Sequence, residues 1–354
     1  MGAGTAATFS TSGASLSHRP STSNRQQMRA LVTGGTGFIG SHLVEALVRH
    51  GAEVTALVRS PGKADRLIEL GVSAVSSDLE DLPALERACA GQNVVYHLAG
   101  LVRARNEAEF LRVNQGGTRN LAAAAQRQGS PRFIQLSSMA AGGPSAPGRP
   151  QTGEETPRPI SAYGRSKLAG ERVVRESELP WTILRPPLVY GPGDTEILRA
   201  FKAAALLGLA PTLGSGAQQL SALFAPDLAA ALIAAGCGET AGKTYPVCHP
   251  EIFTSREMAR AVGEAVGRAV RTVNIPAAVT RVLLAVIGAS ARAVGRPTLL
   301  ESSKADELLA PAWSGDPAAF TRDSGWQATH DLQAGLARTA AWYREQGWLR
   351  PAGK

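Results

Sequence analysis

The stretch Ala30-Leu-Val-Thr-Gly-Gly-Thr-Gly-Phe-Ile-Gly40 decides the fold of this chain. Apolar and β-branched residues at 29–33 predict a strand, and the amphipathic segment 38–50 predicts a helix directly after it. The turn between them is rich in glycine, which permits a tight bend and a close approach of backbone to a pyrophosphate at the helix N-terminus. The stretch therefore predicts a dinucleotide-binding loop, in which the cofactor contacts are expected from Gly34, Thr36, Gly37, Phe38, Ile39 and Gly40.

Strand and helix patterns alternate after this loop. We predict further strands at 53–58, 73–76, 93–98, 132–136 and 181–184, and helices at 63–70, 82–90, 107–128 and 162–177. Regular alternation predicts an α/β fold with a doubly wound parallel sheet. We therefore expect residues 28–190 to form an NAD(P)-binding Rossmann domain.

The pattern changes after about residue 190. Helices are predicted at 195–207, 227–235, 255–266, 278–294, 302–309 and 332–346, with short strands near 244–247 and 272–275. We expect residues 191–354 to form a smaller, mostly helical C-terminal lobe that mainly binds the substrate and is interleaved with the Rossmann core.

The end of the second predicted strand bears on cofactor choice. An NAD enzyme usually carries an acidic residue there, roughly 20 residues beyond the glycines, to bind the ribose 2′-hydroxyl. This chain has Val58 followed by Arg59, and a guanidinium suits a 2′-phosphate. We therefore predict NADP(H), with NAD(H) as the alternative if Arg59 is only a solvated surface residue.

Two short segments follow the third and fourth predicted strands. In an open α/β sheet, ligands bind at the carboxyl ends of the strands. We expect Asp78 and Leu79 to lie near the adenine, and Leu98, Ala99 and Gly100 near the ribose and pyrophosphate.

Tyr163 and Lys167 stand four residues apart on a predicted helix, so their side chains share one face. A phenol has a pKa of about 10, which an ammonium group and an oxidised nicotinamide would lower toward neutrality. We expect Tyr163 to transfer the proton in a carbonyl reduction, with Lys167 lowering its pKa. Ser138, at the end of the fifth strand, is expected to hold the substrate oxygen. Asn114 either joins the proton relay through a water or a backbone group, or kinks its helix.

The motifs together resemble those of the short-chain dehydrogenase/reductase superfamily, in its extended, epimerase/dehydratase-like branch. The resemblance runs from Arg29 to about Asp227, and its pattern is most similar to dihydroflavonol reductases and 3β-hydroxysteroid dehydrogenases. It implies that Ser138, Tyr163 and Lys167 are catalytic, that Lys167 binds the nicotinamide ribose, and that Pro186 lies near the carboxamide. It is carried by residues 33–40, His97-Leu-Ala-Gly100, Ser137-Ser138, Tyr163 with Lys167, and Leu184-Arg-Pro-Pro-Leu-Val-Tyr-Gly-Pro-Gly193.

Departures from the family patterns bear on the reaction. Sugar dehydratases of this branch place Asp-Glu after the catalytic hydroxyl residue, where this chain has Met139 and Ala140. Similar epimerases contact a nucleotide diphosphate where this chain has Leu188 and Leu220. Leucine cannot neutralise a phosphate, so an apolar substrate is expected. We predict an oxidoreductase that interconverts a hydrophobic ketone and a secondary alcohol; a nucleotide-sugar epimerase and a non-catalytic NADP-binding regulator are the alternatives.

Composition narrows the classes of partner. The 354 residues are 44% hydrophobic and carry a net charge of +8, spread without any run of four Lys or Arg, so no nucleic-acid partner is expected. The six His and three Cys lack metal-ligand spacing, so no metal site is expected. We expect Cys89, Cys237 and Cys248 to be buried, reduced thiols of a cytoplasmic protein.

Three further expectations concern particular segments. Residues 1–27 are rich in Ser, Thr, Gly and Ala without Asp or Glu, and are expected to be a disordered or transit-like tail, or to precede a true start at Met28. No stretch reaches the roughly 18 apolar residues of a membrane span. The longest apolar stretch, 282–294, is expected to be a buried or substrate-covering helix. The resemblance implies a homodimer formed through helices 107–128 and 163–174.

Overall fold

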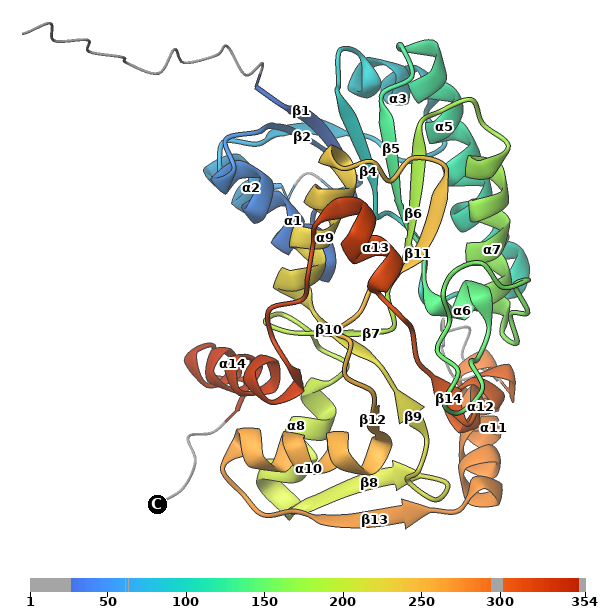
Figure 1. The fold of residues 1–354 in the computed structure, drawn as a ribbon, viewed down its shortest axis with the longest axis vertical. Coiled ribbons are helices and arrows are strands. Elements are labelled where there is room, and N and C mark those ends of the chain that lie inside the picture. Colours follow the sequence, from blue (N-terminus) through green and yellow to red (C-terminus); the bar gives the residue numbers. More distant parts are fainter. Residues whose placement is uncertain (1–26, 61, 63, 294–301, 350–354) are drawn as a thin grey trace, which may run out of the picture.

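A seven-stranded parallel sheet forms the centre of the computed structural model, which describes residues 27–60, 62, 64–293 and 302–349 (Figure 1). The expectation for residues 1–27 lies, apart from Gln27, outside these residues. The sheet has the order β11-β6-β5-β4-β1-β2-β3, and the doubly wound prediction is confirmed. Its strands are β1 (Arg29–Thr33), β2 (Glu53–Val58), β3 (Ser73–Ser76), β4 (Val94–His97), β5 (Arg132–Leu136), β6 (Trp181–Arg185) and β11 (Lys243–Pro246).

Helices cover both faces of the sheet because successive strand residues point to opposite sides. Leu31 packs into a cluster with α3 (Leu82–Cys89), α5 (Thr118–Arg127) and α7 (Ala162–Arg175). Val32, its neighbour, packs into a second cluster with α1 (Phe38–Arg49) and α9 (Ala225–Cys237). Apolar residues on both faces of the central strands therefore hold two helical layers around one sheet.

The strand order reverses beside β1. Strands β2 and β3 follow β1 in order toward one edge of the sheet, and α2 (Asp65–Glu69) precedes β3. The next strand, β4, lies on the other side of β1. The loops leaving β1 and β4 diverge at this reversal, so a crevice opens at the carboxyl ends of the two strands. The predicted glycine loop follows β1, at this crevice.

The helix predicted at 107–128 is interrupted. The structure has α4 (Glu107–Leu111), a π-helical turn η2 (Arg112–Gly117) and then α5. A π-turn holds one extra residue per turn and re-aims the residues within it. The turn contains Asn114, which is buried.

The part of the chain beyond β6 is more β-rich than predicted. Besides the predicted helices, the structure adds short strands in three small sheets, which pair β10 with β7, β12 with β9 and β14, and β13 with β8. Sequence patterns did not show most of them because strands of two to five residues carry almost no periodicity. The remaining elements are α6 (Met139–Gly142), β7 (Leu188–Tyr190), α8 (Leu198–Leu207), β8 (Leu209–Leu213), β9 (Gln219–Leu220), β10 (Ala222–Phe224), β12 (Phe253–Thr254), α10 (Ser255–Val266), β13 (Arg271–Ile275), α11 (Ala277–Ala293), α12 (Ser302–Leu309), β14 (Ala312–Trp313), α13 (Ala318–Ser324) and α14 (Leu332–Glu345).

Two segments after residue 191 belong spatially to the central sheet. Strand β11 pairs with β6, and α9 packs against α1. The remaining elements form a separate apolar cluster around Phe201, Leu336 and Tyr343. The division into a Rossmann domain and an interleaved lobe, with limits at 190 and 191, stays a prediction.

Two predictions of burial were wrong. Cys237 is exposed at the C-terminal end of α9, whereas Cys89 and Cys248 are buried. The apolar helix expected over 282–294 is α11, and most of its apolar side chains that the structure describes are exposed, so the buried alternative was wrong and the substrate-covering alternative stays a prediction. Among the described residues, no helix is both long enough and apolar enough to cross a membrane.

Candidate active site

The glycine loop turns sharply between β1 and α1. Gly34 adopts φ +75°, and a Cβ there would lie 2.8 Å from the backbone nitrogen of Ala99. A Cβ at Gly40 would overlap the carbonyl oxygen of Gly34. Glycine is therefore required at both positions, and Gly37 forms the N-cap of α1. The result is a side-chain-free cradle at a helix N-terminus, which fits a dinucleotide pyrophosphate.

Two connected cavities extend from this cradle. One has a volume of about 400 Å³ and the other about 870 Å³, and both are lined by Gly34, Gly37, Leu98 and Gly100. The smaller cavity also has Thr36, Arg59, Asp78, Leu79 and Ala99 in its wall. The wall of the larger one includes Phe38, Ile39, Gly40, Ser138, Tyr163, Lys167 and Pro186. The structure thus brings together every predicted site residue except Asn114 along one cleft.

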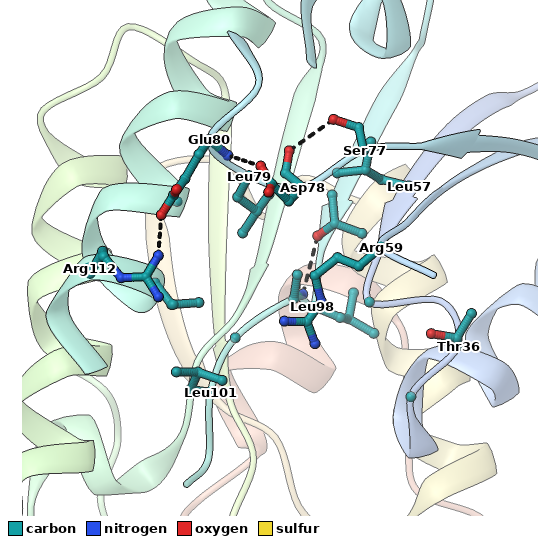
Figure 2. A pocket seen from close by; sticks show the side chains of 17 residues that line it. Thr36, Leu57, Arg59, Ser77, Asp78, Leu79, Glu80, Leu98, Leu101 and Arg112 are labelled. Atoms are coloured by element: carbon teal, nitrogen blue, oxygen red, sulfur yellow. Dashed lines mark hydrogen bonds and ion pairs between the residues drawn. The ribbon is translucent and has the colours of Figure 1, made fainter. Parts of the chain in front are cut away.

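The smaller cavity has the dimensions and lining of a nucleoside site. Figure 2 shows Arg59 reaching into it from the end of β2, opposite Thr36 and beside Leu98, with Asp78 farther along the wall. The carboxylate of Asp78 accepts a hydrogen bond from the backbone of Glu80 at 2.8 Å. Glu80 pairs with Arg112, a second cation in this wall that the sequence did not single out. Arg59 is thus the cation at the place where a ribose 2′-substituent is expected.

The larger cavity holds the proposed proton-transfer group. The Ser161 hydroxyl caps α7 by accepting from the backbone of Gly164 at 3.0 Å, which fixes where the helix begins. Tyr163, one position into the first turn of α7, shares a hydrogen bond with Ser138. Lys167, one turn later, donates from Nζ to the carbonyl oxygen of Leu136 at 2.6 Å. The three predicted catalytic side chains therefore converge beside the end of β5.

The pKa of Tyr163 differs from the sequence-based expectation. We predicted that Lys167 lowers it, but burial raises the pKa of Tyr163 to about 12, and the hydrogen bond from Ser138 offsets only part of this. Burial also lowers the pKa of Lys167 to about 8, against the opposing effect of the buried Glu171 carboxylate. The protein alone thus holds Tyr163 as a protonated phenol, the form needed to donate a proton to a ketone.

A fall in activity above about pH 8 is expected for ketone reduction. Lys167 is charged below its folded pKa of about 8 and loses its proton as the pH rises through that value, while Tyr163 stays protonated to about 12. The measurement is kcat/KM with NADPH across the pH range. A profile that stays level to pH 10 would show that the charge on Lys167 does not support the reaction.

Asn114 lies behind the site rather than in the cleft wall. Its side-chain amide donates to the carbonyl oxygen of Leu101 at 3.0 Å and to Ser166 Oγ at 2.9 Å, while its Oδ1 accepts from the backbone of Leu101 at 2.7 Å. Ser166 in turn donates to the carbonyl oxygen of Tyr163 at 2.7 Å. These bonds tie the π-turn to the loop after β4 and to α7. They favour the helix-kink alternative for Asn114, whose side chain holds the π-turn in place against this loop and α7.

A buried ion pair beneath the site was missed from the sequence. Glu171, one turn after Lys167, accepts from Arg185 at 2.8 and 2.6 Å and from Ser137 Oγ at 2.5 Å. Glu171 and Arg185 are almost fully buried, so each needs the other as a partner. The spacing of Glu171 from Lys167 on α7 was the available signal, since residues four apart share a helix face. The pair anchors Ser137, next to Ser138.

His97 forms a second buried polar link at the end of β4. One ring nitrogen lies 2.8 Å from Thr33 Oγ1 and the other 2.9 Å from Thr118 Oγ1. Burial, with the nearby Lys167 charge, lowers its pKa to about 3, so the ring is neutral. It connects the cofactor loop to α5 and holds the crevice walls together. Among the described residues, no group of three or more His, Cys, Asp or Glu could hold a metal ion.

Comparison with known proteins identifies the family. The sequence profile of the NAD dependent epimerase/dehydratase family matches residues 30–248. The chain belongs to this family. It is 34% identical to ceramide reductase of Caulobacter vibrioides over 319 residues, which cover 90% of this chain and 95% of that protein. It is 29% identical to 2-alkyl-3-oxoalkanoate reductase of Stenotrophomonas maltophilia, covering 89% and 99% of the two chains.

A solved structure has the same fold. MoeE5 in complex with UDP-glucuronic acid and NAD is 26% identical, with a TM-score of 0.71 over 90% of this chain and 99% of that chain. The extended short-chain dehydrogenase/reductase assignment from the motifs is confirmed. The chain is an NAD(P)-dependent oxidoreductase enzyme.

Proposed function

We propose that this enzyme uses NADPH to reduce a ketone within a hydrophobic substrate to a secondary alcohol. When bound, NADPH supplies the hydride to the carbonyl carbon. Ser138 holds the carbonyl oxygen, and Tyr163 donates the phenolic proton to that oxygen as it gains charge. The Lys167 ammonium, one helical turn after Tyr163 and in the same cavity wall, stabilises the phenolate that remains.

The lining of the larger cavity carries this proposal. Near Ser138 and Tyr163 the wall is largely apolar, and its two cations are Arg103 and Lys167. Arg103 pairs with Glu196 in the same wall, and Lys167 bonds to Leu136. A nucleotide diphosphate would need cations free to neutralise its phosphates, whereas an alkyl chain needs only apolar contact. The apolar lining is formed by Leu101, Val102, Pro187, Leu188, Val189 and Ile197.

The two leucines that suggested an apolar substrate differ in position. Leu188 lines the cavity and is partly exposed to it. Leu220 lies on β9 and packs against the apolar cluster of Phe201 and Tyr343, and it does not line the larger cavity. The argument for an apolar substrate therefore rests on Leu188 and its neighbours. Met139 and Ala140, both buried, offer no acid or base for a dehydration step.

Similar proteins support a lipid-like ketone. Two proteins that resemble this chain over about nine-tenths of its length are named for a ceramide and for a 2-alkyl-3-oxoalkanoate. A ketoreductase of Stigmatella aurantiaca, 37% identical over 180 residues, is named for a farnesyl-bearing substrate. We propose a ketone that carries a long alkyl or isoprenoid chain. A homodimer through α4, α5 and α7, and a cytoplasmic location, also stay predictions.

Arg59→Ala is expected to weaken NADPH binding by about ten-fold or more while changing NADH binding less than about two-fold, because a charge-assisted contact to the 2′-phosphate is lost. Fluorescence titration with both cofactors gives the two dissociation constants. The control is Arg49→Ala on α1, which removes an exposed arginine outside the cleft. Equal losses for NADPH and NADH would remove the NADP(H) assignment.

A nucleotide-sugar epimerase is the alternative that the solved structures favour, since MoeE5 binds a UDP sugar. An epimerase retains its cofactor and returns it unchanged, whereas a reductase consumes NADPH and releases the oxidised form. Purified protein is therefore tested with ketones of increasing alkyl length and with UDP sugars. We expect kcat/KM to rise with chain length; inversion of a UDP sugar without net cofactor oxidation would establish the alternative.

A further inference from the structure

Helix α11 presents an unusually apolar surface. Its buried stripe is narrow, with Thr280, Leu284 and Gly288 at four-residue spacing facing inward, and the helix packs against α12. The side chains of Val282 and Val286 are 65% and 58% exposed. Large apolar side chains that are exposed together at helical spacing mark an interaction surface, whereas single exposed apolar residues are common on any protein. The exposed set is Val279, Val282, Leu283, Val286 and Ile287.

The charged residues of the sequence segment that contains this helix are all positive, while the neighbouring α12 carries Asp306 and Glu307. Between Glu264 and Glu301 the sequence contains five arginines and no Asp or Glu. Arg271, on the strand that leads into α11, is exposed, and Arg281 on α11 pairs with Asp306 of α12. An apolar helical face within a basic segment has the chemistry of a helix that lies in the surface of an anionic bilayer. A second copy of the same surface would bring like charges together, which disfavours self-association.

Helix α11 is linked to the catalytic side chain Tyr163 through its neighbour α12. Its partner α12 carries Glu307, whose carboxylate acts electrostatically on Tyr163, so α12 borders the catalytic group. Figure 1 shows α11 and α12 together at one side of the molecule, at the end away from the central sheet, with β13 along the base beside them. A membrane that contacts α11 would therefore lie against the pair of helices that includes Glu307.

We propose that α11 docks the enzyme on an anionic lipid bilayer, with Val282, Val286 and their apolar neighbours inserted among the lipids and Arg271 at the level of the headgroups. The helix lies on the membrane rather than crossing it, since no described helix can span a bilayer. The docking proposal depends on the exposed apolar side chains of α11 and does not depend on which substrate the enzyme reduces. It would give an apolar ketone a direct route from the bilayer to the cleft.

The test is co-sedimentation of the full chain with vesicles of phosphatidylglycerol, compared with phosphatidylcholine, at low and high salt. We expect binding to the anionic vesicles that weakens with salt, and Val282→Glu to reduce the partition coefficient by about ten-fold or more, because an inserted Val is replaced by an anion. The matched control is Ile68→Glu on α2, a 58% exposed apolar residue on another face. It should bind as the unaltered protein does.

Each other outcome overturns the docking proposal. Equal losses from Val282→Glu and Ile68→Glu would mean that net positive charge alone causes the binding. Absence of binding to anionic vesicles would overturn the docking proposal. So would a dimer that Val282→Glu separates, or binding of α11 to an acidic protein in place of lipid. Turnover of a soluble short-chain ketone by Val282→Glu should stay within about two-fold of the unaltered enzyme. The docking proposal can therefore fail while the proposed reaction stands.

Discussion

Replacing Tyr163 with Phe is expected to lower kcat for ketone reduction by about 10²- to 10⁴-fold, the usual contribution of a positioned general acid. The phenylalanine keeps the ring that packs against Phe110 but removes the proton donor beside Ser138. NADPH affinity should change less than about two-fold, because the cradle around Gly34 and Gly40 is untouched. Steady-state kinetics and a cofactor titration on one preparation measure both quantities.

The matched control is Tyr96→Phe. Tyr96 is also buried, in β4 of the central sheet, and its hydroxyl has no hydrogen-bond partner among the described residues. Removal of that hydroxyl should leave kcat within about two-fold. If Tyr163→Phe retained a similar rate, Tyr163 would not be the proton donor and the mechanism proposed for this cleft would be wrong.

Gly40→Ala is expected to reduce NADPH affinity by at least about 100-fold. The added methyl group would overlap the backbone carbonyl oxygen of Gly34. A Cβ is fixed to its Cα and the carbonyl belongs to the backbone, so neither group can rotate away. The first turn of α1 must then shift from the position in which its free N–H groups meet the pyrophosphate. Titration with NADPH measures the loss.

Thermal unfolding with and without NADPH separates a binding defect from a folding defect. Gly40→Ala should lose the stabilisation that NADPH gives, because only binding to the folded state raises the melting temperature. Gly62→Ala is the control, since a Cβ there meets no atom within 4 Å and the backbone is not in the left-handed region. An unchanged affinity in Gly40→Ala would contradict the tight-turn account of the loop.

The sequence predicted the features that depend on local pattern. The glycine loop after β1 and the spacing of Tyr163 and Lys167 on α7 are short-range relations between residues, and the structure places all of them in one cleft. All seven sheet strands were located, including β11 near the predicted 244–247, because their apolar residues are continuous or alternating. The order of these strands was not predicted, because no single residue specifies which strand lies beside which.

Features that depend on distant contacts could not be read from the pattern. The π-turn at Asn114 is fixed by bonds to Leu101 and Ser166, residues 13 and 52 positions away. Burial decides whether the pKa of Tyr163 rises or falls, and the spacing of residues in the sequence does not show how deeply a side chain is buried. The exposure of α11 was not predicted for the same reason, because an apolar helix has the same sequence pattern whether it packs on a core or contacts an outside partner.

The most direct test of the central claim is the stoichiometry of one reaction. Purified enzyme is given NADPH and a long-chain 3-oxo compound, and the oxidised cofactor and the product alcohol are both quantified. We predict one secondary alcohol formed for each NADPH oxidised, with no reaction of a UDP sugar under the same conditions. Inversion of a UDP sugar with the cofactor retained and no alcohol formed from any ketone would contradict the proposed function.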